Sequence, residues 1–169
     1  MKFWSVFATV FTLSLPIQAA PTTNFGLKTP RHDGLQLQRQ IDSYSDMATV
    51  DRLISDREYA KAIPVLDNFL EGSALTDRER SIGHSLRGLA LYMVGRFKEA
   101  IDDFSMSLHI QERSNLIDPN QWKTIFNRGI AHEAAQNLSS AADDFVRAYA
   151  IAPNERRVIQ KILTFFNKE

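Results

Sequence analysis

The chain repeats itself, and this internal similarity constrains its fold more than any other feature of the sequence. The block RGLA at residues 87–90 returns as RGIA at residues 128–131, a displacement of 41 residues. The block AIDDF at residues 100–104 returns at the same displacement as AADDF at residues 141–145. Because two separate blocks keep one offset, we expect a repeated structural unit in which neighbouring copies pack on one another.

The residues around these blocks predict helices. From Ile41 onward, apolar residues recur at spacings of three and four, which is typical of helices that bury one face. No alternating run bounded by turn residues predicts a strand. The fold class is therefore expected to be all-α.

The repeated blocks resemble the tetratricopeptide repeat (TPR) family. Its pattern places a glycine in a first helix and Ala-x-x-x-Phe in a second, often followed by proline. The matching residues here are Gly88, Ala100 and Phe104 in one copy, and Gly129, Ala141, Phe145 and Pro153 in the next. The resemblance implies a TPR-like α-solenoid of about three helix-turn-helix repeats with a C-terminal capping helix.

The sequence and the resemblance together suggest boundaries along the chain. We expect a signal peptide at 1–20, a flexible leader at 21–40 and a TPR domain at 41–169, with repeats at about 43–76, 81–114 and 122–155. A cap helix is expected at 154–168, with Asn154 as its N-cap. The first of these repeats is degenerate, since it lacks the glycine of the first helix. The usual repeat has 34 residues, so a step of 41 implies about seven extra residues, which we place near 115–121.

The N-terminus has the features of an export signal. Lys2 precedes an apolar run from Phe3 to Leu15, Pro16 interrupts the run, and small residues end the segment at Ala19 and Ala20. The run is shorter than the roughly 20 apolar residues of a membrane-spanning helix, although an uncleaved anchor is the alternative. We therefore expect an exported protein, in a bacterial periplasm by preference and secreted as the alternative, with no membrane span after cleavage.

Composition and spacing argue against several classes of function. Twenty basic and 20 acidic residues give a formal net charge of zero, unlike a nucleic-acid-binding protein. The absence of cysteine removes disulfides and thiolate metal sites, and the four histidines show no metal-ligand spacing. The Asp pairs 102–103 and 143–144 are expected to lie on a solvated helix face or to contact Arg87 and Arg128. We predict no enzyme activity, no metal and no cofactor.

A binding surface is the function that the TPR resemblance implies. In stacked helix pairs the first helices line the concave side, where partners usually bind. The residues expected there are Tyr44, Met47, Leu89, Tyr92, Met93, Lys123, Phe126 and Ile130. Some TPR domains hold a partner's C-terminal carboxylate with Lys, Arg and Asn, but only Lys123 and Asn127 are suitable here, so that clamp is not supported.

Two functions follow from this surface. The first is an exported scaffold or adaptor that binds a protein or peptide partner through its concave face. The alternative is a self-assembling structural protein of the cell envelope, in which the same face or the last helix, with Phe165 and Phe166, forms homo-oligomers.

Overall fold

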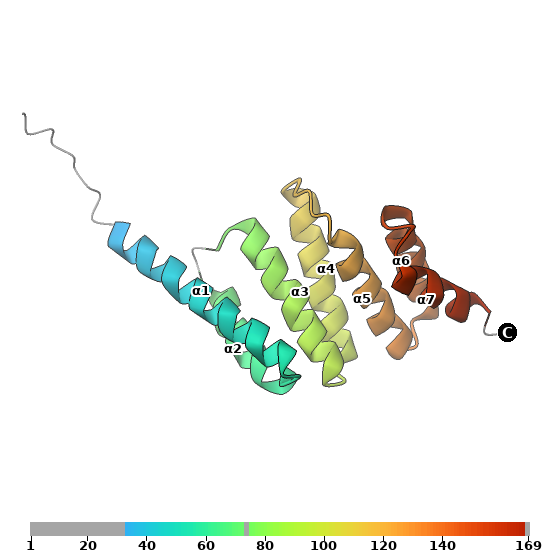
Figure 1. Cartoon of the computed structure of the whole chain (residues 1–169), viewed down its shortest axis with the longest axis horizontal. Coiled ribbons are helices and arrows are strands. Elements are labelled where there is room, and N and C mark those ends of the chain that lie inside the picture. Colours follow the sequence, from blue (N-terminus) through green and yellow to red (C-terminus); the bar gives the residue numbers. More distant parts are fainter. Residues whose placement is uncertain (1–32, 73–74, 168–169) are drawn as a thin grey trace, which may run out of the picture. The chain divides into compact units, whose positions relative to one another are not determined.

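The computed structural model describes residues 33–72 and 75–167, and this part of the chain contains seven helices and no strand (Figure 1). The helices are α1 (Asp33–Ser55), α2 (Tyr59–Glu71), α3 (Asp77–Met93), α4 (Phe97–Arg113), α5 (Gln121–Ala134), α6 (Leu138–Ile151) and α7 (Arg156–Phe166). Each helix packs on its neighbours in the sequence, so the elements follow one another in chain order. The all-α prediction is confirmed, while the predicted signal peptide and the leader up to residue 32 lie outside the described residues.

Tight turns join the helices into three pairs, α1–α2, α3–α4 and α5–α6. Each turn contains one residue in the left-handed region, at Arg57 (φ 60°), Gly95 (φ 84°) and Gln136 (φ 62°). The next backbone N–H then donates to a carbonyl five residues back, as from Arg96 to Leu91 at 2.9 Å. The same bond recurs in the other two turns, so the pair that lacks the glycine motif turns in the same way.

A glycine on the first helix of the second and third pairs meets a phenylalanine on the second helix. Phe104 and Phe145 are fully buried, and their rings lie directly against Gly88 and Gly129. A methyl group added at Gly129 would come within 2.8 Å of the Phe145 ring, which is closer than atoms normally pack. The glycine therefore allows the two helix backbones to approach, and the phenylalanine fills the space between them.

An arginine beside each glycine holds a buried carboxylate of the same pair. Arg87 donates from Nε and Nη2 to both carboxylate oxygens of Asp103, at 2.7 and 2.8 Å. Arg128 makes the same two bonds to Asp144, at 2.8 and 2.7 Å. Of the Asp pairs noted in the sequence, the second member of each thus contacts arginine and is buried, while Asp102 and Asp143 are exposed.

The remaining nitrogen of each arginine reaches back to the preceding pair. Arg87 Nη1 donates to Asp67 of α2 at 2.7 Å, and Arg128 Nη1 donates to Ser105 of α4 at 3.1 Å. Asp67 and Ser105 occupy equivalent positions, since each lies five residues after the buried alanine of its helix (Ala62 or Ala100). One side chain thus fastens two consecutive pairs together.

Burial alone would raise the pKa of Asp103, because desolvation disfavours a charged carboxylate. Hydrogen bonds from Arg87 and from His84 Nδ1, which lies 2.9 Å from Oδ1, outweigh this effect and hold the pKa below its ordinary value. Asp103 therefore remains ionised at neutral pH, and His84 has a structural partner.

The two ends of the described region differ from the boundaries expected from the sequence. Helix α1 begins at Asp33, so residues 33–40, which were assigned to the leader, are helical. Helix α7 begins at Arg156 after Glu155, and no side chain caps it, so Asn154 is not the N-cap. Asn154 instead lies in the turn between α6 and α7. No helix within the described ranges is long and apolar enough to cross a membrane.

We expect Gly129→Ala to lower the free energy of unfolding by about 1–3 kcal/mol, because the new methyl group collides with Phe145 and with Asp144 Cβ. The effect opposes the helix propensity of alanine, which favours it over glycine by about 1 kcal/mol. Urea denaturation measures the difference, with Ser140→Ala at an exposed position of α6 as the control. A Gly129→Ala protein as stable as the parent would show that the close approach is not required.

Arg128→Met should destabilise the protein by about 3 kcal/mol, because it leaves the carboxylate of Asp144, which is 2% exposed, with only Arg147 nearby at 3.9 Å. The double variant Arg128→Met/Asp144→Leu should recover much of that loss, since no buried charge remains. Denaturation midpoints of the two variants test this, with Arg96→Gln in the solvent-exposed Arg96–Glu99 pair as a control that leaves the midpoint unchanged. A double variant no more stable than the single one would contradict the expectation.

Candidate functional site

The residues predicted to line the concave face lie on the first helices α1, α3 and α5. On α1, Met47 is half-buried, whereas the side chain of Tyr44 is not among those described. On α3, Met93 is 46% exposed, while Leu89 and Tyr92 are half-buried and pack against the cluster around Phe104. Helix α3 therefore offers apolar side chains that remain partly accessible.

Helix α5 divides its predicted residues between core and surface. Phe126 is 4% exposed, its ring centroid lies 5.8 Å from that of Phe145, and the Arg157 guanidinium of α7 lies 5.6 Å above it. It therefore belongs to the core and presents no surface to a partner. Ile130 is half-buried against the same core, and Lys123 is exposed, with Nζ 5.7 Å from the Trp122 ring centroid.

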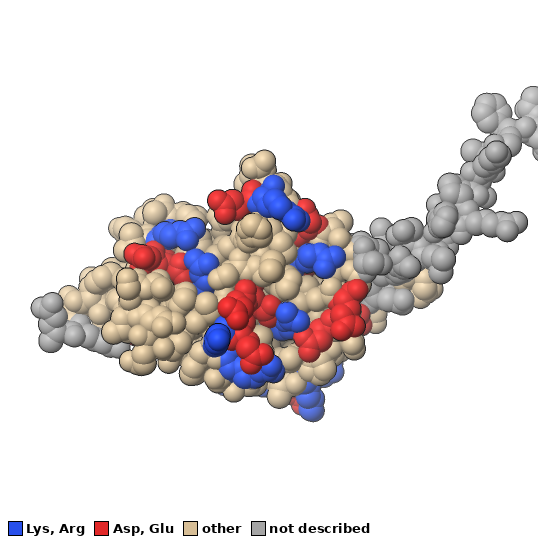
Figure 2. All heavy atoms as spheres, turned by 180° about the vertical axis from the view of Figure 1, so that it is seen from behind, with Lys and Arg blue, Asp and Glu red and all other residues tan. Residues whose placement is uncertain are grey.

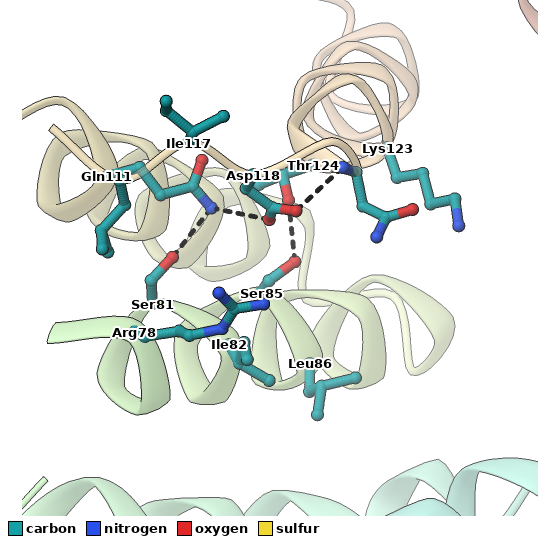
Figure 3. Close-up of a pocket in the computed structure, with 12 residues that line it drawn as sticks. Arg78, Ser81, Ile82, Ser85, Leu86, Gln111, Ile117, Asp118, Lys123 and Thr124 are labelled. Carbon is teal, nitrogen blue, oxygen red and sulfur yellow. Dashed lines mark hydrogen bonds between the residues drawn. The ribbon is translucent and has the colours of Figure 1, made fainter. Parts of the chain in front are cut away.

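A hollow that the sequence did not predict lies among α3, α4, α5 and the segment 114–120 that joins α4 to α5. It has a volume of about 230 Å³ (Figure 3). Its lining comes from α3 (Arg78, Ser81, Ile82, Ser85, Leu86), α4 (Gln111), the joining segment (Leu116, Ile117, Asp118, Asn120) and α5 (Lys123, Thr124). Lys123 was expected on the concave face, and most of the remaining lining comes from the first helices α3 and α5 that form this face, so the hollow opens within it.

The longer helices of the second pair and the segment 114–120 build this hollow. Helices α3 and α4 have 17 residues each, whereas α5 and α6 have 14. Aligned on Gly88 and Gly129, α3 gains its additional turn at its start, and α4 gains one at its end, so both extensions lie beside segment 114–120. The sequence placed the extra residues near 115–121, and the structure has a joining segment at 114–120 and a longer α4 before it. The length of the step alone could not show that these residues form a wall.

Hydrogen bonds fix the polar floor of the hollow. Gln111 is 4% exposed, and its Nε2 donates to Ser81 Oγ at 2.9 Å and to Asp118 Oδ2 at 3.5 Å. Ser81 Oγ also lies 3.2 Å from the Ser107 carbonyl, to which it donates. Ser85 and Thr124 share a hydrogen bond of 3.1 Å between α3 and α5. Gln111 Oε1 is buried and has no hydrogen-bond partner among the described residues.

The charges around the hollow are unevenly paired. Arg78 and Lys123 are exposed, and no ion pair to either is found within the described part of the chain. Both lie in the first turn of a helix, where the helix dipole disfavours a positive side chain. Asp118 is the acidic residue of the lining, and its Oδ1 accepts the Asn120 backbone N–H at 2.8 Å. Two cations and one anion give the lining a formal charge of plus one.

Other acidic residues at the start of α3 are already engaged. Asp77 accepts a hydrogen bond from Ser114 and lies 3.6 Å from Arg113. Glu79 accepts the Thr76 backbone N–H at 2.8 Å in a capping box. These carboxylates fasten the additional turn and its neighbouring segment, so they do not neutralise Arg78 through a direct contact.

No group of three or more metal-ligating side chains occurs in the ranges that the structure describes. His132 is half-buried, and burial lowers its pKa, which favours the neutral ring at pH 7. His84 is held by Asp103, as described above. The histidines on first helices therefore have packing roles.

Comparison with known proteins identifies the fold through structure and not through sequence. No protein-family model matches the chain, and no curated protein matches it in sequence. Among solved structures, the second TPR domain of human RPAP3, in complex with an HSP70 peptide, is 15% identical with a TM-score of 0.64, covering 77% of this chain and 99% of that one. The TPR domain of Arabidopsis OM64 is 16% identical with a TM-score of 0.65, covering 78% and 99%.

The TPR2B domain of yeast Sti1, in its complex with pHsp70, gives 16% identity and a TM-score of 0.63, covering 76% of this chain and 99% of that one. Likeness at such low identity establishes the architecture alone. The chain therefore has the TPR-like α-solenoid fold that the repeated glycine, alanine and phenylalanine residues predicted.

Proposed function

We propose that this protein is a scaffold or adaptor that binds a peptide segment of a partner protein along the face formed by α3 and α5. The observation that carries the proposal is the apolar surface of α3, on which exposed Ile82 lines the polar hollow and half-buried Leu89 and Tyr92 and exposed Met93 follow further along the helix. Apolar and methionine side chains next to a few placed polar groups are favoured in binding surfaces.

The similar solved structures support this proposal. The human RPAP3 and yeast Sti1 TPR domains were solved with HSP70 peptides, so the same architecture binds peptides in other proteins. The fold does not determine the partner. The surface of this chain must therefore identify the partner. Most residues of the clamp for a C-terminal carboxylate are missing from that surface.

We further propose that residues 1–20 direct export and are removed, as their charge and apolar pattern predicts. The scaffold then acts outside the cytoplasm, in a periplasm by preference.

The test is selection of peptides from an unbiased display library on the immobilised full chain, followed by fluorescence anisotropy with the enriched peptides. The double variant Ile82→Ser/Met93→Ser should weaken binding about tenfold, because it removes apolar contacts worth roughly 1–2 kcal/mol in total. Met106→Ser on the second helix α4 is the matched control, since Met106 and Met93 are both 46% exposed. Equal binding by all three proteins would move the site to another face.

Self-assembly is a second candidate, and one observation favours it. Ile159, Leu163 and Phe166 of α7 are exposed on one side of the helix, while Phe165 packs on Phe145 with ring centroids 5.1 Å apart. Figure 2 shows that positively and negatively charged side chains gather together over the middle of the face seen from behind.

Light scattering at micromolar concentration tests this candidate. A dimer that Leu163→Ser converts to monomer would support association through α7. A strict monomer excludes obligate self-assembly and leaves the scaffold proposal intact.

A further inference from the structure

The hollow between α3 and α5 brings together three kinds of side chain that recognise different parts of a peptide. Figure 3 shows the Arg78 guanidinium lying between Ser85 on one side and Ile82 on the other. Thr124 and Asp118 lie beyond Ser85, on the α5 side of the hollow. A cation thus stands at the boundary between a polar wall and an apolar one.

The size of the hollow argues for part of a peptide as its occupant. Its volume of about 230 Å³ is below the roughly 300–1,000 Å³ of pockets that enclose whole small ligands. Helix α3 contributes part of its lining and also carries Tyr92 and Met93, so an extended chain lying along α3 can insert one or two side chains into the hollow. This step rests on the proposed function.

The charges select the chemistry of the inserted side chain. Arg78 has no ion pair within the described residues, and guanidinium groups bind carboxylates with two parallel hydrogen bonds. The carboxylates of Asp77 and Glu79 already occupy the first turn of α3, so the attraction for a ligand carboxylate comes from the Arg78 guanidinium itself. Asp118 on the opposite wall opposes a doubly charged phosphate more than a single carboxylate, because like charges repel.

The apolar wall selects the neighbour of that side chain. Ile82 is 37% exposed beside Arg78, and Leu86 follows it one turn along α3. An aliphatic side chain placed there removes apolar surface from water on both partners. Ile117 on the joining segment is 92% exposed and adds a second aliphatic group to the lining.

We propose that this hollow is a specificity pocket, in which Arg78 receives an internal Asp or Glu side chain of the bound peptide and Ile82 contacts an aliphatic residue next to it. The pocket depends on the additional turns of α3 and α4 and on segment 114–120. It recognises a side chain, so the peptide needs no free C-terminal carboxylate.

The test uses peptides enriched by display selection on the full chain, resynthesised with an amidated C-terminus and a fluorescent label. Enriched sequences should place Asp or Glu beside Ile, Leu or Val. Replacing that acid by its amide should weaken anisotropy-measured binding to the parent protein about tenfold, as expected for a lost charge-assisted hydrogen bond.

The same replacement should change binding to Arg78→Gln less than twofold, because the partner of the carboxylate is already gone. Arg147→Gln, at an exposed arginine of α6, should retain the tenfold difference. Unchanged circular-dichroism melting curves establish that both variants remain folded.

Each other outcome overturns the inference in a recognisable way. Two outcomes overturn the pocket and leave the scaffold proposal intact. In the first, the enriched peptides show no preference for an acidic residue. In the second, replacing the acid by its amide weakens binding to Arg78→Gln as much as to the parent protein. A peptide that loses binding when its C-terminus is amidated, but keeps binding when its Asp or Glu side chain is replaced by the amide, shows that a C-terminal carboxylate is recognised instead. If no peptide is enriched, both the pocket and the proposed function fail.

Discussion

In the second and third helix pairs, the close contact between a glycine of the first helix and a phenylalanine of the second determines how the repeats are built. Gly88 and Gly129 have no side chain to hold the helices apart, and Phe104 and Phe145 occupy the space that results. A single helix pair cannot bury its apolar stripe, so stability arises when neighbouring pairs stack. The orientation of α3 and α5, and hence of the face that they present, follows from this contact.

The Arg–Asp pairs add direction to this packing. Arg87 and Arg128 bind a buried carboxylate within their own pair and a polar group on the preceding second helix. Hydrophobic contacts tolerate small sliding movements, whereas two fixed hydrogen-bond geometries on one guanidinium do not. We regard these arginines as the residues that define the register between successive repeats, in a chain where apolar packing supplies the cohesion.

The repeat motif was sufficient to predict the fold. It predicted only part of the candidate site. Gly88 and Gly129, with the alanines and phenylalanines that follow them, predicted the helix pairs. A glycine repeated in both copies of a helix most often allows two helix backbones to approach closely. The TPR resemblance placed Leu89, Tyr92 and Met93 on the concave face; they are partly exposed, and their role in binding stays a prediction. Phe126 is different, because its burial depends on α7 and Arg157, which cross it from a distant part of the sequence.

The hollow could not be predicted for a related reason. A 41-residue step indicates where residues are added, but Gln111, Asp118 and Thr124 come together only when two lengthened helices and a joining segment fold over one another. Their combination has no spacing signature in the sequence.

The unequal length of the helix pairs has a consequence for any ligand that lies across them. A solenoid of identical repeats presents a periodic surface, on which an extended chain can shift by one repeat and make equivalent contacts. Here α1 and α2 have 23 and 13 residues, the helices of the second pair have 17 each and those of the third have 14 each, so no two pairs are alike. Under the proposed scaffold function, a bound chain therefore has one preferred alignment, and the protein places its partner at a defined position as well as retaining it.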